Sequence, residues 1–201
     1  MLGNDIVDLG DPETQPGARH PRFDARVFTR EERAALAGAA DPERLRWSLW
    51  SAKEAAYKCV KKLASATCFS PVRFAVRLET DRTGSVTFAG RRLRVAIFSE
   101  EDALHAVATD AADPESAVLR AVSTLSASQA PGSASSAVRE LARDAAAAHL
   151  GCAPGELAIS REGRVPRLRR RGADPGLDLS LAHHGRFLAA AFETHTGAGA
   201  T

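Results

Sequence analysis

The sequence predicts an α+β fold made of two similar halves. Apolar residues recur at the spacing of an amphipathic helix over residues 42–63 and 136–151, whereas shorter runs between turns alternate or are apolar throughout, as strands do. The segment LRVAIFSEEDALHAVATD (93–110) has the pattern strand, polar turn, strand, and LDLSLAHHGRFLAAAFE (177–193) repeats it at nearly the same length. We therefore expect two antiparallel sheets, each packed on helices, with the two halves face to face.

The first half is expected to extend over residues 1–110. The run LGNDIVDLG alternates as a strand does, and a loop containing Pro and Gly follows it. A helix begins after Thr29, its N-cap, and Glu32 completes a capping box; the next helix begins after Asp41, with a proline in its first position. Four strand-like runs complete this half: VRFAVRLE, GSVTFAG, RLRVAIFS and LHAVATD.

A connecting segment and a second half follow. Residues 111–136 contain one short helical run and then SASQAPGSASS, whose Ser, Ala, Pro and Gly composition is typical of a linker. The second half, residues 137–201, begins with the helix SAVRELARDAAAAHLG, which ends at Gly151 as C-cap. A basic loop comes next, and the hairpin at 177–193 closes the half.

Composition and charge restrict the class of protein. A chain of 201 residues can bury one substantial core or two small ones, and a net charge of +2 is too near neutral to favour nonspecific nucleic-acid binding. The three cysteines lack metal-ligand spacing, no signal peptide opens the chain, and no apolar run is long enough to span a bilayer. We expect a cytoplasmic protein without a membrane or nucleic-acid partner, in which the arginines at 167–171 are solvated surface.

The helix around Glu54 raises a question, because both tryptophans of the chain share its charged face. At 100° per residue the core stripe comprises Leu45, Leu49, Ala52, Ala56, Cys59 and Leu63. The opposite face, centred on Glu54, comprises Trp47, Trp50, Lys58 and Lys61. One interpretation is that the indoles cover the edge of the core and that Glu54 and Lys58 form a surface pair. The other is that this face lines a cleft between the halves, where the indoles pack on the second half and the charges meet a ligand.

Three segments together resemble the 4′-phosphopantetheinyl transferases, enzymes that load carrier proteins. GNDIVDL is similar to the Gly-x-Asp strand of that family, and WSAKEAAYK is similar to its Lys-Glu-Ala-x-x-Lys helix. The interval of about fifty residues between Asp5 and Glu54, with RVFTREE inside it, resembles the smaller, holo-acyl-carrier-protein synthase type. LSLAHHGRFLAAAF resembles the Leu-Ser-x-Ser-His-x-Gly hairpin of the larger, surfactin-synthetase-activating type, and GELAISREGRVPRL resembles its Gly-x-Pro element.

The order of these segments differs from that of the larger type, in which the His hairpin precedes the acidic strand. The resemblance implies two halves related by a pseudo-twofold axis, so an exchanged order would leave a shared site intact. Ala182 stands where the family has a Ser before its His, and the Gly-x-Pro element is stretched to Gly163 and Pro166. Val7 stands where the larger type has a second acid, so we expect only two protein carboxylates on the metal.

The resemblance implies transfer of phosphopantetheine from coenzyme A to a serine of an apo carrier protein, with release of adenosine 3′,5′-bisphosphate. Such a displacement depends on positioning and charge neutralisation. The matching residues Asp5 and Glu54 are expected to bind Mg²⁺, although Asp5 seen alone could simply accept bonds from backbone amides. Glu54 is also a candidate base, directly or through a metal-bound water, and Lys58 is expected to stabilise the leaving group. Lys53 is expected at the edge of the site.

His183 matches the family histidine that donates to the 3′-phosphate of coenzyme A. Arg139 and Arg164, the latter beside Pro166, are candidates by position to bind the same phosphate. His184 and His195 are expected to be merely exposed. Because carrier domains are acidic around their serine, the basic residues that stand where the smaller type makes this contact are expected to dock the carrier: Arg19, Arg22 and Arg26.

Two other functions are compatible with the sequence. A catalytically silent relative could bind carrier protein or coenzyme A as a regulatory module, although such a protein would have little use for Asp5, Glu54 and Lys58 together. A nucleic-acid binder could use the arginines at 167–171, but the chain lacks a recognisable groove-reading helix or aromatic stacking sheet. Two halves in one chain would make a monomer sufficient.

Overall fold

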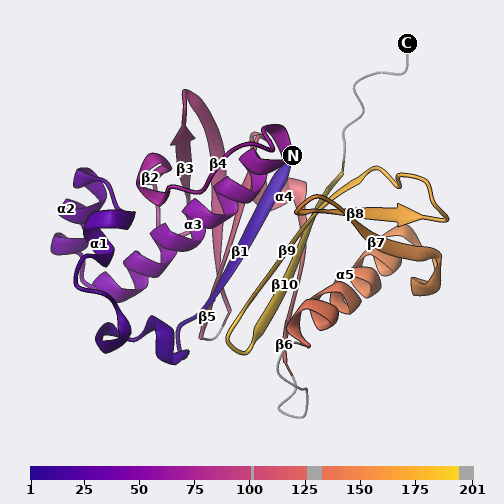
Figure 1. The fold of residues 1–201 in the computed structure, drawn as a ribbon, viewed down its shortest axis with the longest axis horizontal. Coiled ribbons are helices and arrows are strands. Elements are labelled where there is room, and N and C mark those ends of the chain that lie inside the picture. The colour runs from indigo at the N-terminus through magenta and orange to yellow at the C-terminus, as the bar shows by residue number, and fades with distance from the viewer. Residues whose placement is uncertain (101, 126–132, 195–201) are drawn as a thin grey trace.

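The computed structural model describes residues 1–100, 102–125 and 133–194, and its first half is a five-stranded sheet covered by helices (Figure 1). The strands run in the order β1-β5-β4-β3-β2, and neighbouring strands are antiparallel. Their bounds are β1 Leu2–Asp8, β2 Ala75–Leu78, β3 Thr83–Phe88, β4 Arg91–Glu100 and β5 Ala103–Thr109. The helices are η1 Pro12–Thr14, η2 Pro16–Ala18, α1 Phe23–Val27, α2 Arg30–Gly38, α3 Pro42–Leu63 and η3 Pro71–Arg73.

The second half repeats the same sequence of elements with a smaller sheet. Its elements are α4 Pro114–Ala117, β6 Val118–Thr124, α5 Ala134–Leu150, η4 Pro154–Glu156, β7 Leu157–Glu162, β8 Val165–Arg170, β9 Leu177–His184 and β10 Phe187–Thr194. The order β6-β10-β9 corresponds to β1-β5-β4, and the β7-β8 hairpin corresponds to β2-β3. Each half is therefore a strand, a long helix and four further strands. The predicted α+β class and the predicted repeat of the hairpin are both confirmed.

Two segments differ from their predictions. Residues 118–124, expected in the connecting segment, form β6, which pairs along its whole length with β10. The basic loop expected after α5 is the β7-β8 hairpin, whose turn contains Gly163 at φ 61°. Few side chains of this hairpin are buried, chiefly Leu157 and Leu168, so the alternation that identifies a strand is weak there. Of the predicted linker, residues 126–132 lie outside the described part of the chain, as does His195.

The predicted helix caps are present. Thr29 accepts a hydrogen bond from the Glu32 amide (3.2 Å), and the Glu32 carboxylate accepts one from the Thr29 amide (2.8 Å). Asp41 accepts from the Arg44 amide at the start of α3 (2.9 Å). Gly151 ends α5 in the left-handed conformation, at φ 60°. No helix in the described part of the chain has the length and apolar character needed to cross a bilayer.

The two halves meet along β1, which lies beside β9 at the centre of the molecule (Figure 1). The amide groups on the free edge of β1 donate to side chains of β9: Leu2 to Asp178 (2.9 Å), Asn4 to Ser180 (2.9 Å) and Asp8 to His184 (3.0 Å). Polar side chains thus satisfy an edge that another strand would otherwise have to cover. This arrangement brings the end of β1 next to the tip of the β9-β10 hairpin.

Candidate functional site

The site is built where α3 crosses β1. A side chain at Gly3 would place its Cβ 2.1 Å from the Ala55 carbonyl oxygen and 2.5 Å from the Cys59 amide nitrogen, so only glycine permits this approach. The close crossing brings Glu54 and Lys58 of α3 next to Asp5 of β1. The close crossing explains why a glycine, Gly3, stands two residues before Asp5.

Asp5, Glu54 and Lys58 form one electrostatic unit. Lys58 donates to Oδ1 of Asp5 at 2.8 Å, and both side chains are partly buried. Burial raises the pKa of Asp5, while Lys58 opposes that rise. Burial, together with the negative charge of Asp5, raises the pKa of Glu54 to about 7.

The donor set of this unit fits a hard divalent cation. Among the described residues nothing donates a hydrogen bond to the Glu54 carboxylate or pairs with it, although the side chain is only partly exposed. Two acids that repel each other beside a cleft provide the oxygen ligands that Mg²⁺ prefers. Asp5 and Glu54 are therefore the residues that would hold the metal.

A basic pocket of about 170 Å³ lies one helical turn beyond this unit. Lys58, Lys61 and Lys62 of α3 form one wall, and residues of β8, β9 and the β7-β8 turn, including Arg164, form the other. The ammonium of Lys62 is already engaged, because it donates to Asp178 (2.8 Å) and to the Leu179 carbonyl (2.8 Å). Lys58 is paired with Asp5, and Lys61 donates to a neutral acceptor, the Thr67 carbonyl (2.8 Å), so the positive charge that no described carboxylate pairs with comes from Lys61 and Arg164.

A second basic pocket, of about 160 Å³, lies next to the first and shares Arg164, Pro166 and Leu181 with it. Its polar lining includes Arg139, Arg161 and His183. The structure thus brings together all four residues that were predicted from the second half: Arg139, Arg164, Pro166 and His183. The sequence patterns do not identify Arg161, because its position depends on the β7-β8 hairpin, whose apolar alternation is weak.

His183 lies at the junction of the two halves. Partial burial lowers its pKa, and the positive charge of Lys58 lowers it further, whereas Asp5 opposes this. The imidazole is thus near enough to Lys58 and Asp5 to be influenced by both, although it belongs to the other sheet.

Lys53 does not belong to this site, which corrects the prediction. Its side chain is fully buried, and its ammonium donates to Glu32 (2.8 Å), to the Pro71 carbonyl (3.2 Å) and to the Phe74 carbonyl (2.6 Å). A rotation of 100° from Glu54 turns Lys53 toward α2 and β2 instead of the pockets. All three hydrogens of the ammonium have acceptors within the first half.

Among the described residues, the indoles of Trp47 and Trp50 do not pack on the second half, as they would if they lined a cleft between the halves. Trp47 donates to the Thr14 carbonyl (3.1 Å) and packs on Phe23, and Trp50 packs on Phe23 and Phe69. These partners all belong to the first half. The second half contributes one residue nearby, His184, to a pocket of about 520 Å³ that Trp47 and Trp50 also line. The indoles thus cover the edge of the first core and form one wall of an open pocket.

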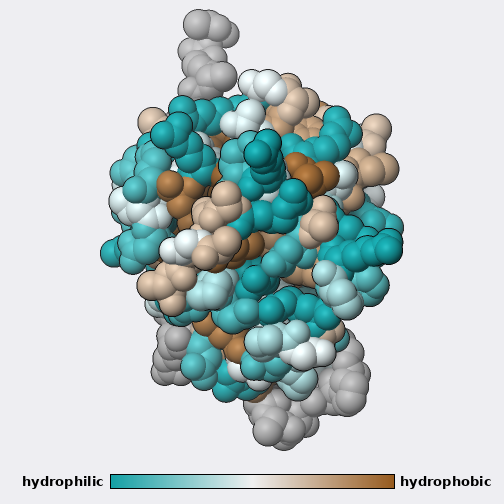
Figure 2. Space-filling model, turned by 90° about the vertical axis from the view of Figure 1, so that its left-hand side faces the viewer, coloured by the Kyte–Doolittle hydropathy of each residue, from teal (hydrophilic) through white to brown (hydrophobic). Residues whose placement is uncertain are grey.

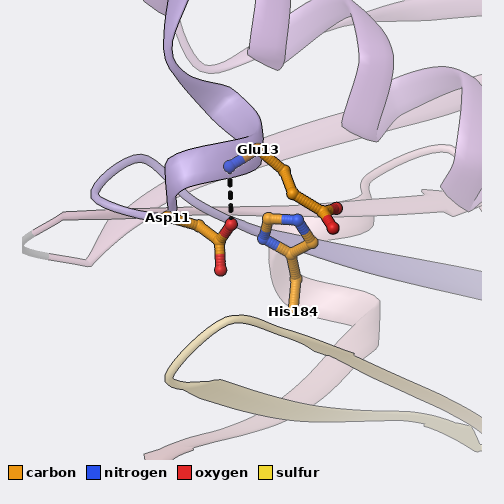
Figure 3. Close-up of side chains that lie close together, drawn as sticks. All are labelled: Asp11, Glu13 and His184. Atoms are coloured by element: carbon orange, nitrogen blue, oxygen red, sulfur yellow. Dashed lines mark hydrogen bonds between the residues drawn. The ribbon is translucent and has the colours of Figure 1, made fainter. Parts of the chain in front are cut away.

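Asp11, Glu13 and His184 form a separate group of possible metal ligands at this pocket (Figure 3). Their ligand atoms lie within 4.8 Å of one another, and the imidazole extends from the β9-β10 hairpin toward η1. However, Nδ1 of His184 accepts a hydrogen bond from the Asp8 amide, so the neutral ring carries its proton on Nε2. A protonated Nε2 does not bind a metal, so the hydrogen bond from Asp8 argues against a metal at this group.

The predicted carrier contacts divide into two kinds. Arg19 is paired through both terminal nitrogens with Glu43, and its side chain is 14% exposed. Arg22 and Arg26 are exposed at the start and end of α1, and neither forms an ion pair among the described residues. The face that carries α1 and α2 is mainly hydrophilic, with small separate apolar patches (Figure 2).

The arginines at 167–171 form ion pairs with nearby glutamates. Arg167 and Arg169 pair with Glu162, and Arg170 and Arg171 pair with Glu156. The strongest basic run in the sequence is therefore an ion-pair network on the β7-β8 hairpin.

Comparison with known proteins is informative for the first half. A family model described as 4′-phosphopantetheinyl transferase superfamily matches residues 1–112, which is more than half of the chain. The matched region includes Asp5, Glu54 and Lys58. No curated protein matches the chain.

Proposed function

Because the chain belongs to the 4′-phosphopantetheinyl transferase superfamily, we propose that it transfers the 4′-phosphopantetheine arm of coenzyme A to a serine of an apo carrier protein. Adenosine 3′,5′-bisphosphate is the second product. The observation that best supports this function is the meeting of two residue sets. Asp5, Glu54 and Lys58 come from the matched half, and they lie beside basic pockets that the second half completes with Arg164 and His183.

The basic pockets suit the nucleotide end of coenzyme A, which is its polyanionic part. The pocket of Arg139, Arg161, Arg164 and His183 offers charged donors to the 3′-phosphate. The pocket of Lys58 and Lys61 lies between this position and Asp5, so the pyrophosphate is expected there. Arg164 lines both pockets and can contact either group.

The reaction requires charge neutralisation and removal of one proton. The serine oxygen attacks the phosphorus that carries the pantetheine, the bond from that phosphorus to the bridging oxygen breaks, and the nucleotide leaves with that oxygen. Mg²⁺ held by Asp5 and Glu54 would neutralise negative charge on the pyrophosphate. Lys58 donates to the developing charge of the leaving group. Glu54 would accept the serine proton, directly or through a water.

The carrier protein is expected to approach along α1. The guanidinium groups of Arg22 and Arg26 form no ion pair with any described residue, whereas Arg19 is held by Glu43 and lines the pocket of Trp47 and Trp50. One chain contains both halves of the site, so a monomer would suffice.

The test is intact-protein mass spectrometry of a panel of apo carrier proteins incubated with this protein, coenzyme A and Mg²⁺. We expect some carriers to gain one phosphopantetheine arm, and EDTA to abolish the gain. Glu54→Gln should lower turnover by about two to four orders of magnitude, as removal of a general base does. Glu140→Gln, at an exposed acid on α5, is the matched control and should leave turnover unchanged. Retained turnover in Glu54→Gln, or no transfer to any carrier, would contradict the proposal.

A further inference from the structure

The tip of the β9-β10 hairpin is bound to the end of β1 by an ion pair that the catalytic proposal does not use. Arg186 donates from Nε to Oδ2 of Asp8 (2.9 Å) and from Nη2 to Oδ1 (2.8 Å). The Arg186 backbone amide also donates to Oδ2 (2.9 Å). The Asp8 side chain is 1% exposed, so this bidentate contact closes over a buried carboxylate.

The same pair fixes the residues on both sides of it. The Asp8 amide donates to Nδ1 of His184, and Arg186 also contacts Asp102 in the β4-β5 turn (3.3 Å). Gly185, at φ 52°, allows the turn to approach so closely that a Cβ there would lie 2.5 Å from Oδ2 of Asp8. The Asp8 carboxylate therefore holds the backbone and the side chain of Arg186, and the Asp8 backbone amide holds the neighbouring His184.

The position of His183 also depends on this anchor. It stands two residues before the turn, and its imidazole makes no hydrogen bond to other described residues. Its place opposite Arg139 and Arg164 is therefore set by where the hairpin tip is held.

We propose that Asp8 and Arg186 are positioning residues, which hold His183 at the phosphate pocket and thereby make the enzyme select coenzyme A over 3′-dephospho-coenzyme A. This inference rests on the proposed function. A positioning role of the ion pair can be distinguished from a purely structural one, because a loss of folded protein lowers the rates with both substrates equally. Loss of positioning lowers the rate only with the substrate that carries the 3′-phosphate.

The experiment measures kcat/KM for coenzyme A and for 3′-dephospho-coenzyme A, with one apo carrier protein as acceptor. His183→Ala should reduce the ratio of the two values about tenfold, as loss of a hydrogen bond to a charged group does. Asp8→Asn and Arg186→Gln should reduce the same ratio severalfold, chiefly through KM for coenzyme A. In the His183→Ala background, Asp8→Asn should leave the ratio unchanged, since the group it positions is gone.

Arg92→Gln is the matched control, because Arg92 is also 56% exposed and pairs with a carboxylate, Glu79, away from the pockets. Arg186→Gln leaves a buried carboxylate without its partner, so Asp8→Asn, which leaves an exposed arginine, is the primary variant. Circular dichroism melting verifies that each variant is folded. A normal ratio in both Asp8→Asn and Arg186→Gln, with a reduced ratio in His183→Ala, would overturn the inference and leave the proposed function standing. A normal ratio in His183→Ala would instead contradict the proposed phosphate site.

Discussion

Asp5 and Glu54 share one site, yet their partners differ. Lys58 pairs with Asp5, whereas Glu54 has no partner among the described residues and lies beside the negative charge of Asp5. An unpaired, partly buried carboxylate is unfavourable for folding, so a purely structural role does not account for it. Its cost is understandable if the group must accept a proton or a cation during the reaction. The residue pair therefore follows the pattern in which functional groups are held in environments that perturb their pKa.

His105 provides a pH-dependent test of the junction between the halves. His105 is fully buried. Its Nε2 lies 3.1 Å from the side-chain nitrogen Nδ2 of Asn4, and its Nδ1 lies 3.4 Å from Nη1 of Arg120. Burial, and then the charges of Arg120 and Lys58, lower its pKa from 6.5 to about 3. The unfolded chain therefore binds a proton at this residue below pH 6.5, whereas the folded protein does not until about pH 3. Stability should fall as the pH falls between these values, by about 1.4 kcal/mol per pH unit from this residue.

His105→Gln should remove that contribution and flatten the dependence. Urea unfolding at pH 7, 6, 5 and 4 measures it, and the slope is informative even if the variant is less stable at every pH. His149→Gln, at an exposed histidine of α5, is the control and should retain the slope. Equal slopes in the two variants would show that His105 does not stay neutral in the folded protein.

Sequence motifs identified the candidate catalytic residues better than the residues that we propose to position them. Asp5, Glu54 and Lys58 were predicted because their spacing matches a motif, and the crossing of α3 over β1 brings them together. Asp8 and Arg186 were not predicted, because nothing in either segment indicates that residues 178 positions apart form an ion pair. The same limitation explains the wrong assignment of Lys53, whose environment is decided by Glu32 on another helix.

At the scale of elements, the crossing of α3 over β1 sets the geometry of the site. Gly3→Ala should force α3 away from β1, because the added Cβ would meet the backbone of Ala55 and Cys59, which cannot rotate away. We expect a loss of about 3 kcal/mol, the upper end for overpacking, together with lower turnover because Glu54 moves away from Asp5. Thermal melting and the transfer assay measure the two effects. Gly17→Ala, where a Cβ meets nothing within 4 Å, should change neither; similar behaviour of the two variants would contradict the role of the crossing.

Lys53 gives a second test at this scale, because it binds α3 to α2 and to the start of β2. Lys53→Met leaves the Glu32 carboxylate buried without its charged partner, which should cost about 3–5 kcal/mol. At low temperature, where part of the Lys53→Met protein is folded, its KM for coenzyme A should stay normal. Lys58→Met is the contrasting variant and should impair catalysis with a smaller effect on stability, since Lys58 is 29% exposed. If Lys53→Met raised the KM for coenzyme A and left the melting temperature normal, Lys53 would belong to the coenzyme A site after all.

Local signals predicted most of the elements. The caps at Thr29, Asp41 and Gly151 involve residues close in sequence, so their chemistry is visible without the fold. The strand β6 was missed because its middle is only partly buried and its pairing is decided by β10, about seventy residues later. The β7-β8 hairpin was missed because ion pairs, not apolar residues, cover its exposed face.

At the scale of the molecule, the site requires both halves. The first half supplies Asp5, Glu54 and Lys58, and the second supplies His183 and the arginines of the pockets. Side chains of β9 satisfy the edge of β1, and the nearly buried pair of Lys62 and Asp178 adds a further connection. Because these contacts depend on the two sheets being neighbours and not on the order of the segments, an exchange of the halves along the chain is compatible with one shared site.

The outer face of α1 is the surface at which we expect the carrier protein to dock. Reversal of charge in the double variant Arg22→Glu and Arg26→Glu should raise KM for an acidic carrier protein about tenfold at low ionic strength, through slower association. The difference from the unmodified protein should shrink at high salt, because exposed charges are screened. KM for coenzyme A should not change, since neither arginine lines the basic pockets. Arg92→Glu, at an exposed arginine of the central strand β4, controls for the change in net charge. Equal changes in KM for carrier and for coenzyme A, or an equal effect of Arg92→Glu, would show that the carrier does not dock on α1.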